Sequence, residues 1–219
     1  MAQGYVRASD LPQVIPVFPL PGAILLPRGQ LPLNVFEPRY LNMIDDAMAG
    51  DRIIGMVQTQ GGPQSLPGLS LIGCAGRITS FAETSDGRYL ITLTGCARFR
   101  LTSELSSQTP YRQIRADFVP FEADLSAPPV DDVDLDRDGL LDALRAYLET
   151  RGLDIDWDTA GTAPPEALVN SLSMALPFDP PEKQALLEAV SLTDRSRVLT
   201  ALLTIDAAGD GDGEAPSMQ

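Results

Sequence analysis

The sequence predicts an α+β protein in which a small barrel, or strongly curled sheet, precedes a set of helices. As far as residue 121, apolar and polar residues alternate in short runs typical of half-buried strands. From residue 136, apolar residues recur at the spacing of one helix face. The charge changes at the same place: residues 1–121 hold ten arginines and nine acids, whereas residues 122–219 hold six basic and twenty-one acidic groups. This difference indicates two units with different surfaces.

The first part begins with two strands and a helix. Strands are expected at Val14–Phe18 and Leu31–Phe36, separated by a loop rich in proline. A helix is expected to begin at Pro38, since proline at the first helical position gives up only an N–H that has no partner there. Gly50 is expected to end it.

Further strand patterns follow as far as residue 121. They are expected at 52–59, 69–84, 89–94, 97–104 and 111–121, with a bend at Gly95, and the glycines inside 69–84 indicate a bulge or a close backbone approach. Asp86-Gly87 between two of these runs predicts a hairpin with a type I′ turn, in which both residues have positive φ. Six or seven strands at this spacing predict a barrel that closes to hide its edges.

The helical part is expected to follow a linker that contains Pro128 and Pro129. Helix patterns surround Leu144, Leu172 and Leu187, and Thr193 is expected to cap a last helix. The expected organisation is a barrel at 1–121, a linker at 122–135, a helical bundle at 136–206 and a disordered tail at 207–219.

Missing residue types exclude several kinds of chemistry. The chain has no histidine, which excludes serine–histidine and cysteine–histidine catalysis and histidine–metal ligation. Lys183 is the single lysine and does not lie in a phosphate-binding loop motif. It is expected on the polar side of its helix, where it would not activate a serine. Cys74 and Cys96 are expected to be buried thiols in a reducing compartment. The sequence shows neither a secretory signal nor a membrane span, so a cytoplasmic location is expected.

Two motifs leave alternatives open. Residues 134–142 begin like a calcium-binding loop, but Arg145 stands where a bidentate glutamate is needed, so an acid-rich helix start is preferred. Arg98, Phe99 and Arg100 resemble an RNA-binding pattern. Alternation places Phe99 on the face opposite the two arginines, which favours a core position for the ring.

Longer motifs identify a family resemblance. The run FPLPGAILLPRGQLPLNVFEPRYLNMIDDAM (Phe18–Met48) resembles the opening of the N-terminal, substrate-binding domain of Lon proteases. Three later segments are similar to further signatures of that domain: Gly73–Ile78, Asp86–Leu101 and Leu176–Leu203. The resemblance covers roughly Val14 to Leu203. It implies a PUA-like β-barrel of about six strands with one or two helices, followed by a C-terminal α-helical bundle.

The resemblance also implies an expected function. The sequence ends before the ATPase and peptidase modules of Lon proteases, so we expect a stand-alone, non-catalytic module without cofactor or metal. Its expected partners are unfolded or extended polypeptide segments, with a protease as a further partner and no membrane or nucleic acid. They would bind in a groove between barrel and bundle or along an unpaired sheet edge. The candidate binding residues are Phe36, Glu37, Arg39, Tyr40, Arg77, Arg98 and Phe99.

Three alternatives stay open at this stage. Glu37 and Arg39 could simply pair with each other while the aromatic rings fill the barrel. The module could bind RNA, as PUA-like barrels of other families do. It could also sense a small molecule or peptide and act on a protease in trans. The sequence does not fix the ligand, the oligomeric state or the pathway.

Overall fold

The computed structural model describes residues 4–63, 66–126 and 135–211, with side chains as far as residue 208. Contacts divide the chain into two compact units. The first combines residues 1–128 with 177–187, and the second combines 129–176 with 188–219. Each unit is described separately below.

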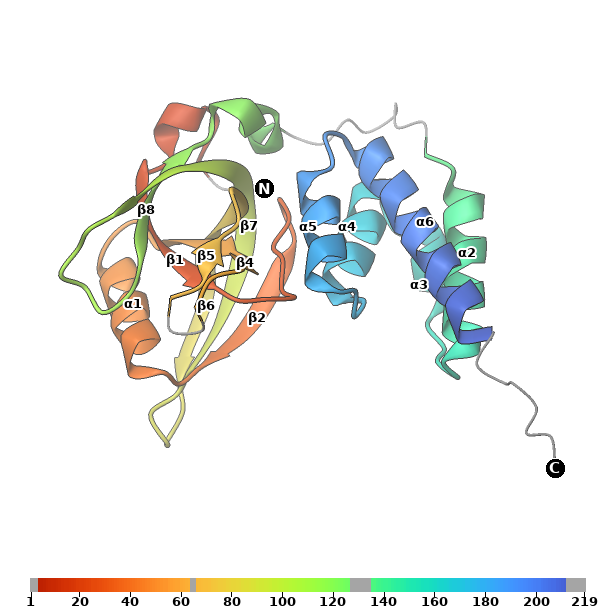
Figure 1. Ribbon diagram of the computed structural model, residues 1–219, viewed down its shortest axis with the longest axis horizontal. Coiled ribbons are helices and arrows are strands. Elements are labelled where there is room, and N and C mark those ends of the chain that lie inside the picture. The colour runs from red at the N-terminus through yellow and green to blue at the C-terminus, as the bar shows by residue number, and fades with distance from the viewer. Residues whose placement is uncertain (1–3, 64–65, 127–134, 212–219) are drawn as a thin grey trace. The chain divides into compact units, whose positions relative to one another are not determined.

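The first unit is built on a six-stranded mixed sheet that closes into a barrel (Figure 1). Its strand order is β2-β7-β6-β3-β1-β8, and a further pairing of β8 with β7 completes the ring. The strands are β1 (Val14–Pro19), β2 (Gln30–Val35), β3 (Ile53–Val57), β6 (Ile72–Glu83), β7 (Tyr89–Leu105) and β8 (Gln113–Asp117). A separate two-stranded sheet pairs β4 (Thr59–Gln60) with β5 (Gly68–Leu69). The predicted barrel is therefore confirmed, with β2 extending from β7 outside the ring.

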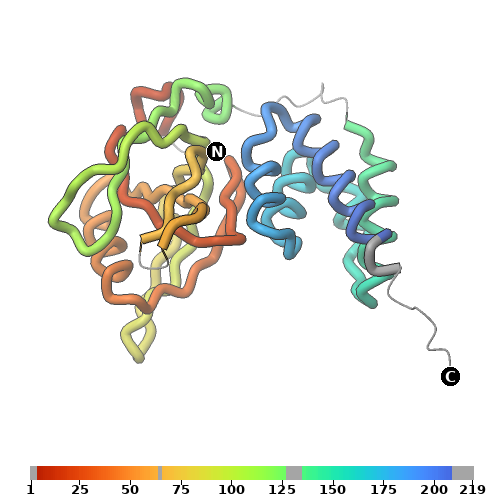
Figure 2. The backbone as a smooth tube through the Cα atoms, in the orientation of Figure 1, coloured from red at the N-terminus to blue at the C-terminus, as the bar shows by residue number. Residues whose placement is uncertain are grey.

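Closure depends on the length and curvature of β7. Its first part, residues 89–94, pairs with β2, and its last part, residues 100–105, pairs with β8. The strand curves over the sheet between these two partners (Figure 2). A register shift between Ala75 and Gly76 places a bulge in the β6–β7 ladder. The glycines inside the predicted strand thus mark a bulge, as expected.

Gly95 shows why this bend requires glycine. A Cβ atom at this position would lie 2.0 Å from the carbonyl oxygen of Leu26, so the β1–β2 loop could not approach so closely. With glycine there, the Gly95 carbonyl accepts a hydrogen bond from Arg28 N at 2.8 Å, and Gly95 N donates to Gly29 O at 2.9 Å. The bonds hold a loop whose Ile24, Leu25 and Leu26 side chains are buried.

The β6–β7 turn differs from the predicted type I′ geometry. φ is positive at Gly87 but not at Asp86. Gly87 N donates to Thr84 O at 3.0 Å and Thr84 N donates to Arg88 O at 2.9 Å, a pattern typical of a type I turn followed by a left-handed glycine. The Thr84 hydroxyl also bonds the Asp86 carboxylate, which favours this longer loop over the two-residue turn.

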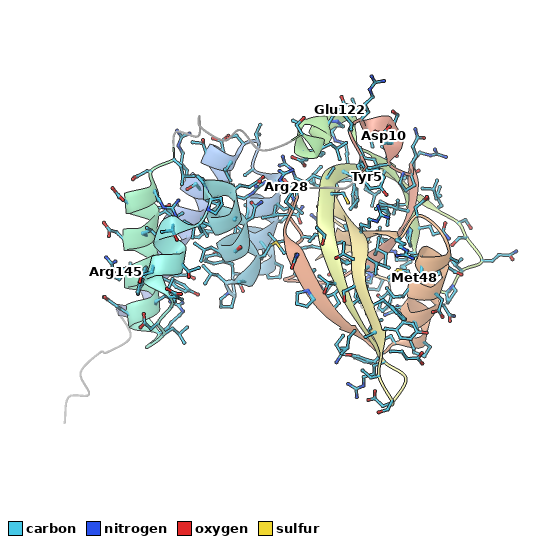
Figure 3. All side chains as sticks on the ribbon, turned by 180° about the vertical axis from the view of Figure 1, so that it is seen from behind. Tyr5, Asp10, Arg28, Met48, Glu122 and Arg145 are labelled. Atoms are coloured by element: carbon cyan, nitrogen blue, oxygen red, sulfur yellow. The ribbon has the colours of Figure 1, made fainter. Side chains whose placement is uncertain are left out.

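Three helical elements cover the barrel ends and sides. Helix α1 (Pro38–Ala49) begins at proline and is followed by Gly50, as predicted. The short 3₁₀ helices η1 (Ala8–Asp10) and η2 (Val119–Leu125) lie at the barrel end opposite the β6–β7 turn (Figure 1). Figure 3 shows Tyr5, Asp10 and Glu122 gathered there, and the Glu122 carboxylate accepts a hydrogen bond from Ala8 N at 2.9 Å. Because η2 continues to residue 125, the ordered barrel unit extends past the expected boundary at 121.

Helix α5 (Pro180–Glu188) groups with the barrel unit, although the sequence placed it in the bundle. Buried Gln58 donates to Pro180 O at 2.9 Å and to Gln184 Oε1 at 3.0 Å, and its own Oε1 accepts from Gly22 N. Gln184 in turn donates to Ile72 O at 3.1 Å. These polar contacts hold α5 on the barrel, which periodicity alone could not reveal.

The second unit contains α2 (Arg137–Thr150), α3 (Trp157–Thr162), α4 (Pro165–Ala175) and α6 (Leu192–Gly211). Its buried side chains include the leucines predicted for the helix faces: Leu140, Leu144, Leu148, Leu168, Leu199 and Leu203. Buried Arg195 donates to Asn170 Oδ1 at 2.9 Å and so joins α6 to α4. The predicted helices are present, and α3 was not predicted.

Two sequence predictions about this unit are corrected. Ser191, not Thr193, caps α6: its hydroxyl accepts a hydrogen bond from Asp194 N at 3.0 Å. The last helix also continues to Gly211, so residues 207–211 are helical and not part of a disordered tail. The predicted tail beyond residue 211, the prolines of the linker and the start of the 134–142 motif lie outside the described residues. No helix in the described part of the chain is long and apolar enough to cross a membrane.

Candidate functional site

A cavity of about 440 Å³ opens on the barrel unit beside the start of α1. Four prolines contribute to its lining: Pro19, Pro21, Pro67 and Pro110. Two tyrosines and two arginines also line it: Arg39, Tyr40, Tyr111 and Arg112. The volume lies within the range of roughly 300–1,000 Å³ that is common for ligand sites. Rigid apolar walls with a few polar groups are suited to holding a side chain or a short extended segment.

The start of α1 places Arg39 and Tyr40 at the cavity. Tyr40 stacks on Phe18 of β1, with ring centroids 4.2 Å apart and planes inclined by 17°. The Arg39 guanidinium lies over the Tyr40 ring, 4.6 Å from its centroid. Glu37 Oε2 accepts from Arg39 Nε at 2.9 Å and lies 2.7 Å from Nη2. The expected alternative of an internal Glu37–Arg39 pair is therefore correct, yet Arg39 still lines the cavity.

Arg112 forms a fixed part of the opposite wall. Its Nε and Nη2 donate to the two carboxylate oxygens of Glu104 at 2.6 and 2.7 Å. Its Nη1 donates to Pro67 O at 2.7 Å, which holds the loop that precedes β5. The bidentate bond to the Arg112 guanidinium lowers the pKa of Glu104 below its ordinary value. The pair therefore keeps its charges and its geometry at neutral pH.

Tyr111 joins the cavity to α1 from another side. Its hydroxyl donates to Asp46 Oδ2 at 2.6 Å. Burial and this bond to a carboxylate raise the pKa of Tyr111 to about 12, so the phenol stays protonated. Tyr89 makes a similar bond to the neighbouring Asp45 at 3.0 Å. The acidic side of α1 is thus held to the barrel by two phenols, which stabilises the wall that carries Arg39 and Tyr40.

Two of the predicted binding residues, Phe36 and Arg77, lie on other parts of the barrel, outside the cavity lining. Phe36 is 62% exposed, and the Arg88 guanidinium lies 5.7 Å from its ring centroid. Arg77 is half-buried on β6, where it faces Ile53 of β3 and Thr94 of β7. Neither residue lines the cavity together with Tyr40. Phe36 and Arg77 therefore form separate surface positions, not parts of one site with α1.

Arg98 and Phe99 are interior residues. Phe99 is 0% exposed within the barrel core and packs edge-to-face on Phe118. Arg98 is 6% exposed and bonds both carboxylate oxygens of Asp124 in η2 at 2.9 Å. Its Nη1 also donates to Leu187 O at 3.3 Å. Strand alternation correctly placed the two residues on opposite faces, but the structure buries both, so neither presents a surface to a ligand.

Lys183 contradicts the expectation that its amine lies on the polar side of a helix. The side chain is only 2% exposed, and its Nζ lies 6.0 Å from the centroid of the Phe178 ring. Burial lowers the pKa of Lys183 to about 8. The predicted exposure of Lys183 was wrong because its polar neighbours, Glu182 and Gln184, do not indicate that the side chain is buried.

Sequence reasoning missed the far wall of the cavity, Pro110 to Arg112. These residues stand at the start of a predicted strand, and nothing local separates Tyr111 from other strand aromatics. Pro19, Thr59 and Leu66 come from three further segments of the chain. Only the closed barrel brings these segments together.

The two cysteines are buried free thiols, as expected. Burial raises the pKa of Cys96 to about 11, which disfavours a reactive thiolate. Among the described residues, no cluster of three or more histidine, cysteine or acidic side chains could hold a metal ion. Residue 134, where the calcium-like motif starts, is not among them.

The fold and the cavity define a closed mixed barrel with a preformed, ligand-sized site. Residues 14–204 match the family model described as the ATP-dependent protease La (LON) substrate-binding domain. The chain belongs to this family. The resemblance inferred from the Phe18–Met48 motif is thereby confirmed.

Known relatives agree with this assignment. The chain is 27% identical over 203 residues to Lon protease 2 of Myxococcus xanthus, covering 91% of this chain and 24% of the relative. It is 28% identical over 209 residues to Lon protease of Anaeromyxobacter dehalogenans, covering 90% and 24%. The chain thus spans about a quarter of the length of these curated relatives.

Solved structures share the fold. A crystal structure of a Lon N-terminal domain protein from Xanthomonas campestris matches with a TM-score of 0.60 and 23% identity, covering 86% of this chain and 97% of that one. The N-terminal domain of Mycobacterium avium complex Lon protease matches with a TM-score of 0.60 and 19% identity, covering 92% and 100%.

Proposed function

We propose that the barrel unit is a non-catalytic module that binds unfolded or extended segments of other proteins. Membership of a substrate-binding domain family supports this role. The observation that carries the proposal is the preformed cavity of prolines, tyrosines and arginines beside α1. Its apolar walls can accept a large side chain, while its arginine and phenol donors can bond the carbonyls of an extended chain.

An extended strand added to the sheet edge is the less favoured mode. Among the described strands, β2 pairs only with β7 and so offers its other edge. Pro32 stands in the middle of β2 and has no N–H to donate. The edge is therefore interrupted, as is common where proteins prevent strand addition. We place the binding site in the cavity.

The absence of catalysis is part of the proposal. The family match concerns the substrate-binding domain, and the sequence has no histidine and a single lysine. We further propose that the module serves as an adaptor or regulator in protein quality control, presenting bound segments to a protease in trans. A cytoplasmic location stays a prediction.

RNA binding is the second candidate, and the geometry argues against it. A stacking platform needs exposed rings between cationic side chains. The two residues on which that hypothesis depended, Arg98 and Phe99, are buried. Salt-sensitive retention of a single-stranded oligonucleotide would contradict this conclusion.

The proposal is tested with a permanently unfolded protein as the probe. Fluorescein-labelled, reduced and carboxymethylated lactalbumin is titrated with the full chain, and binding is followed by anisotropy. Thr59→Trp fills the cavity and is expected to weaken binding about tenfold or more. Ser80→Trp adds the same ring at an exposed position of β6 and is expected to leave binding unchanged.

Three results would count against the proposal. The unchanged chain could fail to bind the probe, or Thr59→Trp could bind as tightly as Ser80→Trp. Cleavage of the probe by the purified chain, with or without ATP, would overturn the claim that the module is non-catalytic.

A further inference from the structure

We infer that the cavity is specific for an acidic residue next to a large apolar one in an extended polypeptide segment. The carboxylate would bond the Tyr40 hydroxyl and the Arg39 guanidinium, while the apolar side chain would occupy the proline-lined wall. This inference rests on the proposed function and names the class of segment that the module selects.

The first support is the Tyr40 hydroxyl. Tyr40 is only 6% exposed, yet its hydroxyl makes no hydrogen bond with any described residue. The hydroxyl oxygen is not one of the buried side-chain atoms that lack a partner among the described residues, so the oxygen itself is accessible although the ring is buried. Because Tyr40 lines the cavity, a ligand acceptor can reach this group. Desolvation raises the pKa of Tyr40 above its ordinary value, so the hydroxyl is a donor at neutral pH.

The second support is the position of Arg39. Its guanidinium carbon lies over the Tyr40 ring, 4.6 Å from the ring centroid, so the positive charge is close to the phenol ring. The Glu37 carboxylate contacts only the Nε and Nη2 atoms of Arg39, and both of these atoms contact the same oxygen, Oε2. Nη1 makes no hydrogen bond within the described part of the chain and keeps two N–H donors. An arginine donor beside a phenol donor is an arrangement that recognises a carboxylate.

The charge of the lining points the same way. Arg39 and Arg112 line the cavity, and the lining contains no acidic side chain among the described residues. Arg112 already donates hydrogen bonds to Glu104 and to Pro67 O. It therefore adds a fixed positive charge to the lining, and we do not assign it a hydrogen bond to the ligand. Glu37 partly offsets Arg39 from outside the lining. An incoming carboxylate therefore competes with Glu37 for the same guanidinium.

The apolar neighbour follows from the rest of the lining. Pro19, Pro21 and Pro110 present rigid apolar surface, and Leu66 is 60% exposed at the rim. A free carboxylate or phosphate ion would use the donors but leave this surface uncovered. A segment with a phenylalanine next to a glutamate would use both. The volume of about 440 Å³ is sufficient for two such side chains.

The experiment uses three matched peptides, acetylated and amidated so that their ends carry no charge. They differ only at the centre, which is phenylalanine–glutamate, phenylalanine–glutamine or alanine–glutamate. Anisotropy with the full chain is expected to show about tenfold weaker binding when glutamate becomes glutamine. Loss of the phenylalanine is expected to weaken binding at least as much. Excess acetate or inorganic phosphate is expected to compete poorly.

Three variants assign the selectivity to the cavity. Tyr40→Phe and Arg39→Gln are each expected to weaken binding of the glutamate peptide several-fold and to leave the glutamine peptide almost unchanged. Glu37→Gln is expected to have the opposite sign, a few-fold tighter binding, because it removes the competing carboxylate. The matched control is Arg88→Gln, since Arg88 is exposed, pairs with Asp86 and lies outside the lining. Its affinities should equal those of the unchanged chain.

The outcomes separate the inference from the proposed function. If the glutamate and glutamine peptides bind equally and Thr59→Trp still blocks both, the inference fails and the proposed function stands. If no peptide binds but the carboxymethylated lactalbumin does, the inference fails and the proposed function stands; if neither the peptides nor the lactalbumin bind, both fail. If Tyr40→Phe weakens both peptides to the same extent, the hydroxyl has only a structural role and the inference fails. Acetate or phosphate competing as strongly as the peptides would show a simple anion site and would also overturn it.

Discussion

At the residue scale, Arg98 shows how an arginine that looks suited to ligand binding can be structural. Its neighbours in sequence, Ala97 and Phe99, predict a strand, and an arginine on a strand is usually exposed. Its partner Asp124 lies in η2, which sequence patterns did not indicate as ordered. The Phe121 ring also lies 4.8 Å from the guanidinium. Burial of such a charge is tolerated only with a close partner, and here the partner comes from outside the sheet.

Removal of that partner gives the first prediction. Asp124→Asn removes the carboxylate charge that pairs with the buried Arg98 guanidinium, so we expect the free energy of unfolding of the barrel unit to fall by about 3 kcal/mol. Urea denaturation measures the change. Asp86→Asn is the control, because Asp86 and Arg88 form an exposed pair on the β6–β7 turn. Equal effects of the two substitutions would show that the buried pair has no special role.

Lys183 gives the second prediction, on pH dependence. Its pKa is lowered from 10.5 to about 8, so between these values the unfolded chain binds more protons than the folded chain. Stability therefore rises with pH across this window, and below pH 8 the buried ammonium keeps its full cost. Relative to Lys183→Met, the unchanged chain should gain roughly 3 kcal/mol between about pH 7.5 and 10.5.

Comparison with the methionine variant cancels the tyrosines and Cys96, which titrate in the same alkaline range in both proteins. Denaturant curves at four or five pH values measure the difference. A difference that does not change with pH would contradict the burial of the charged amine.

At the scale of single elements, the sequence predicted what local patterns control. Short apolar runs identified β1 and β3, alternation identified β2, and the proline–glycine pair identified the ends of α1. What failed depended on side-chain contacts that local patterns of apolar residues do not show. Asp86-Gly87 formed a longer turn because Thr84 supplies a side-chain bond. Helix α5 has the periodicity of a bundle helix, yet its place is decided by Gln58, which lies 122 residues before its partner Pro180.

The attachment of α5 gives the third prediction. Gln58→Ala removes the acceptor for Gly22 N and the donor for Pro180 O and for Gln184, which are three part-buried hydrogen bonds. We expect a loss of about 2 kcal/mol in the free energy of unfolding. Hydrogen exchange should show faster exchange of the α5 amides than of the β6 amides.

Gln60→Ala is the control, because Gln60 is an exposed residue of β4. Its effect on both measurements should be close to zero. If Gln58→Ala left the exchange of α5 unchanged, the polar bonds would not be what holds this helix on the barrel.

At the scale of the whole molecule, the candidate site could be predicted only in part. Arg39 and Tyr40 were identified because they lie within one continuous motif. Pro110, Tyr111 and Arg112 were not predicted because the cavity brings together segments that are far apart in the sequence, such as Pro19 and Arg112. Their proximity follows from ring closure through the β7–β8 and β1–β8 pairs. Sequence patterns predict that strands exist, but register and order require the folded sheet.

The division into two compact units gives the last prediction. Trp157 is the only tryptophan and lies in α3, where the Arg145 guanidinium covers its ring at 4.8 Å. Its fluorescence therefore reports unfolding of the second unit. Leu144→Ala opens space in that unit, and we expect the fluorescence midpoint in urea to move by the equivalent of about 3 kcal/mol. Phe99→Leu, in the barrel core, should leave this midpoint unchanged and should instead speed exchange of the β3 and β6 amides. A substitution that shifted both signals equally would show that the chain unfolds as one cooperative unit. Two separate cores share one unfolding transition only when contacts outside the cores couple their stabilities.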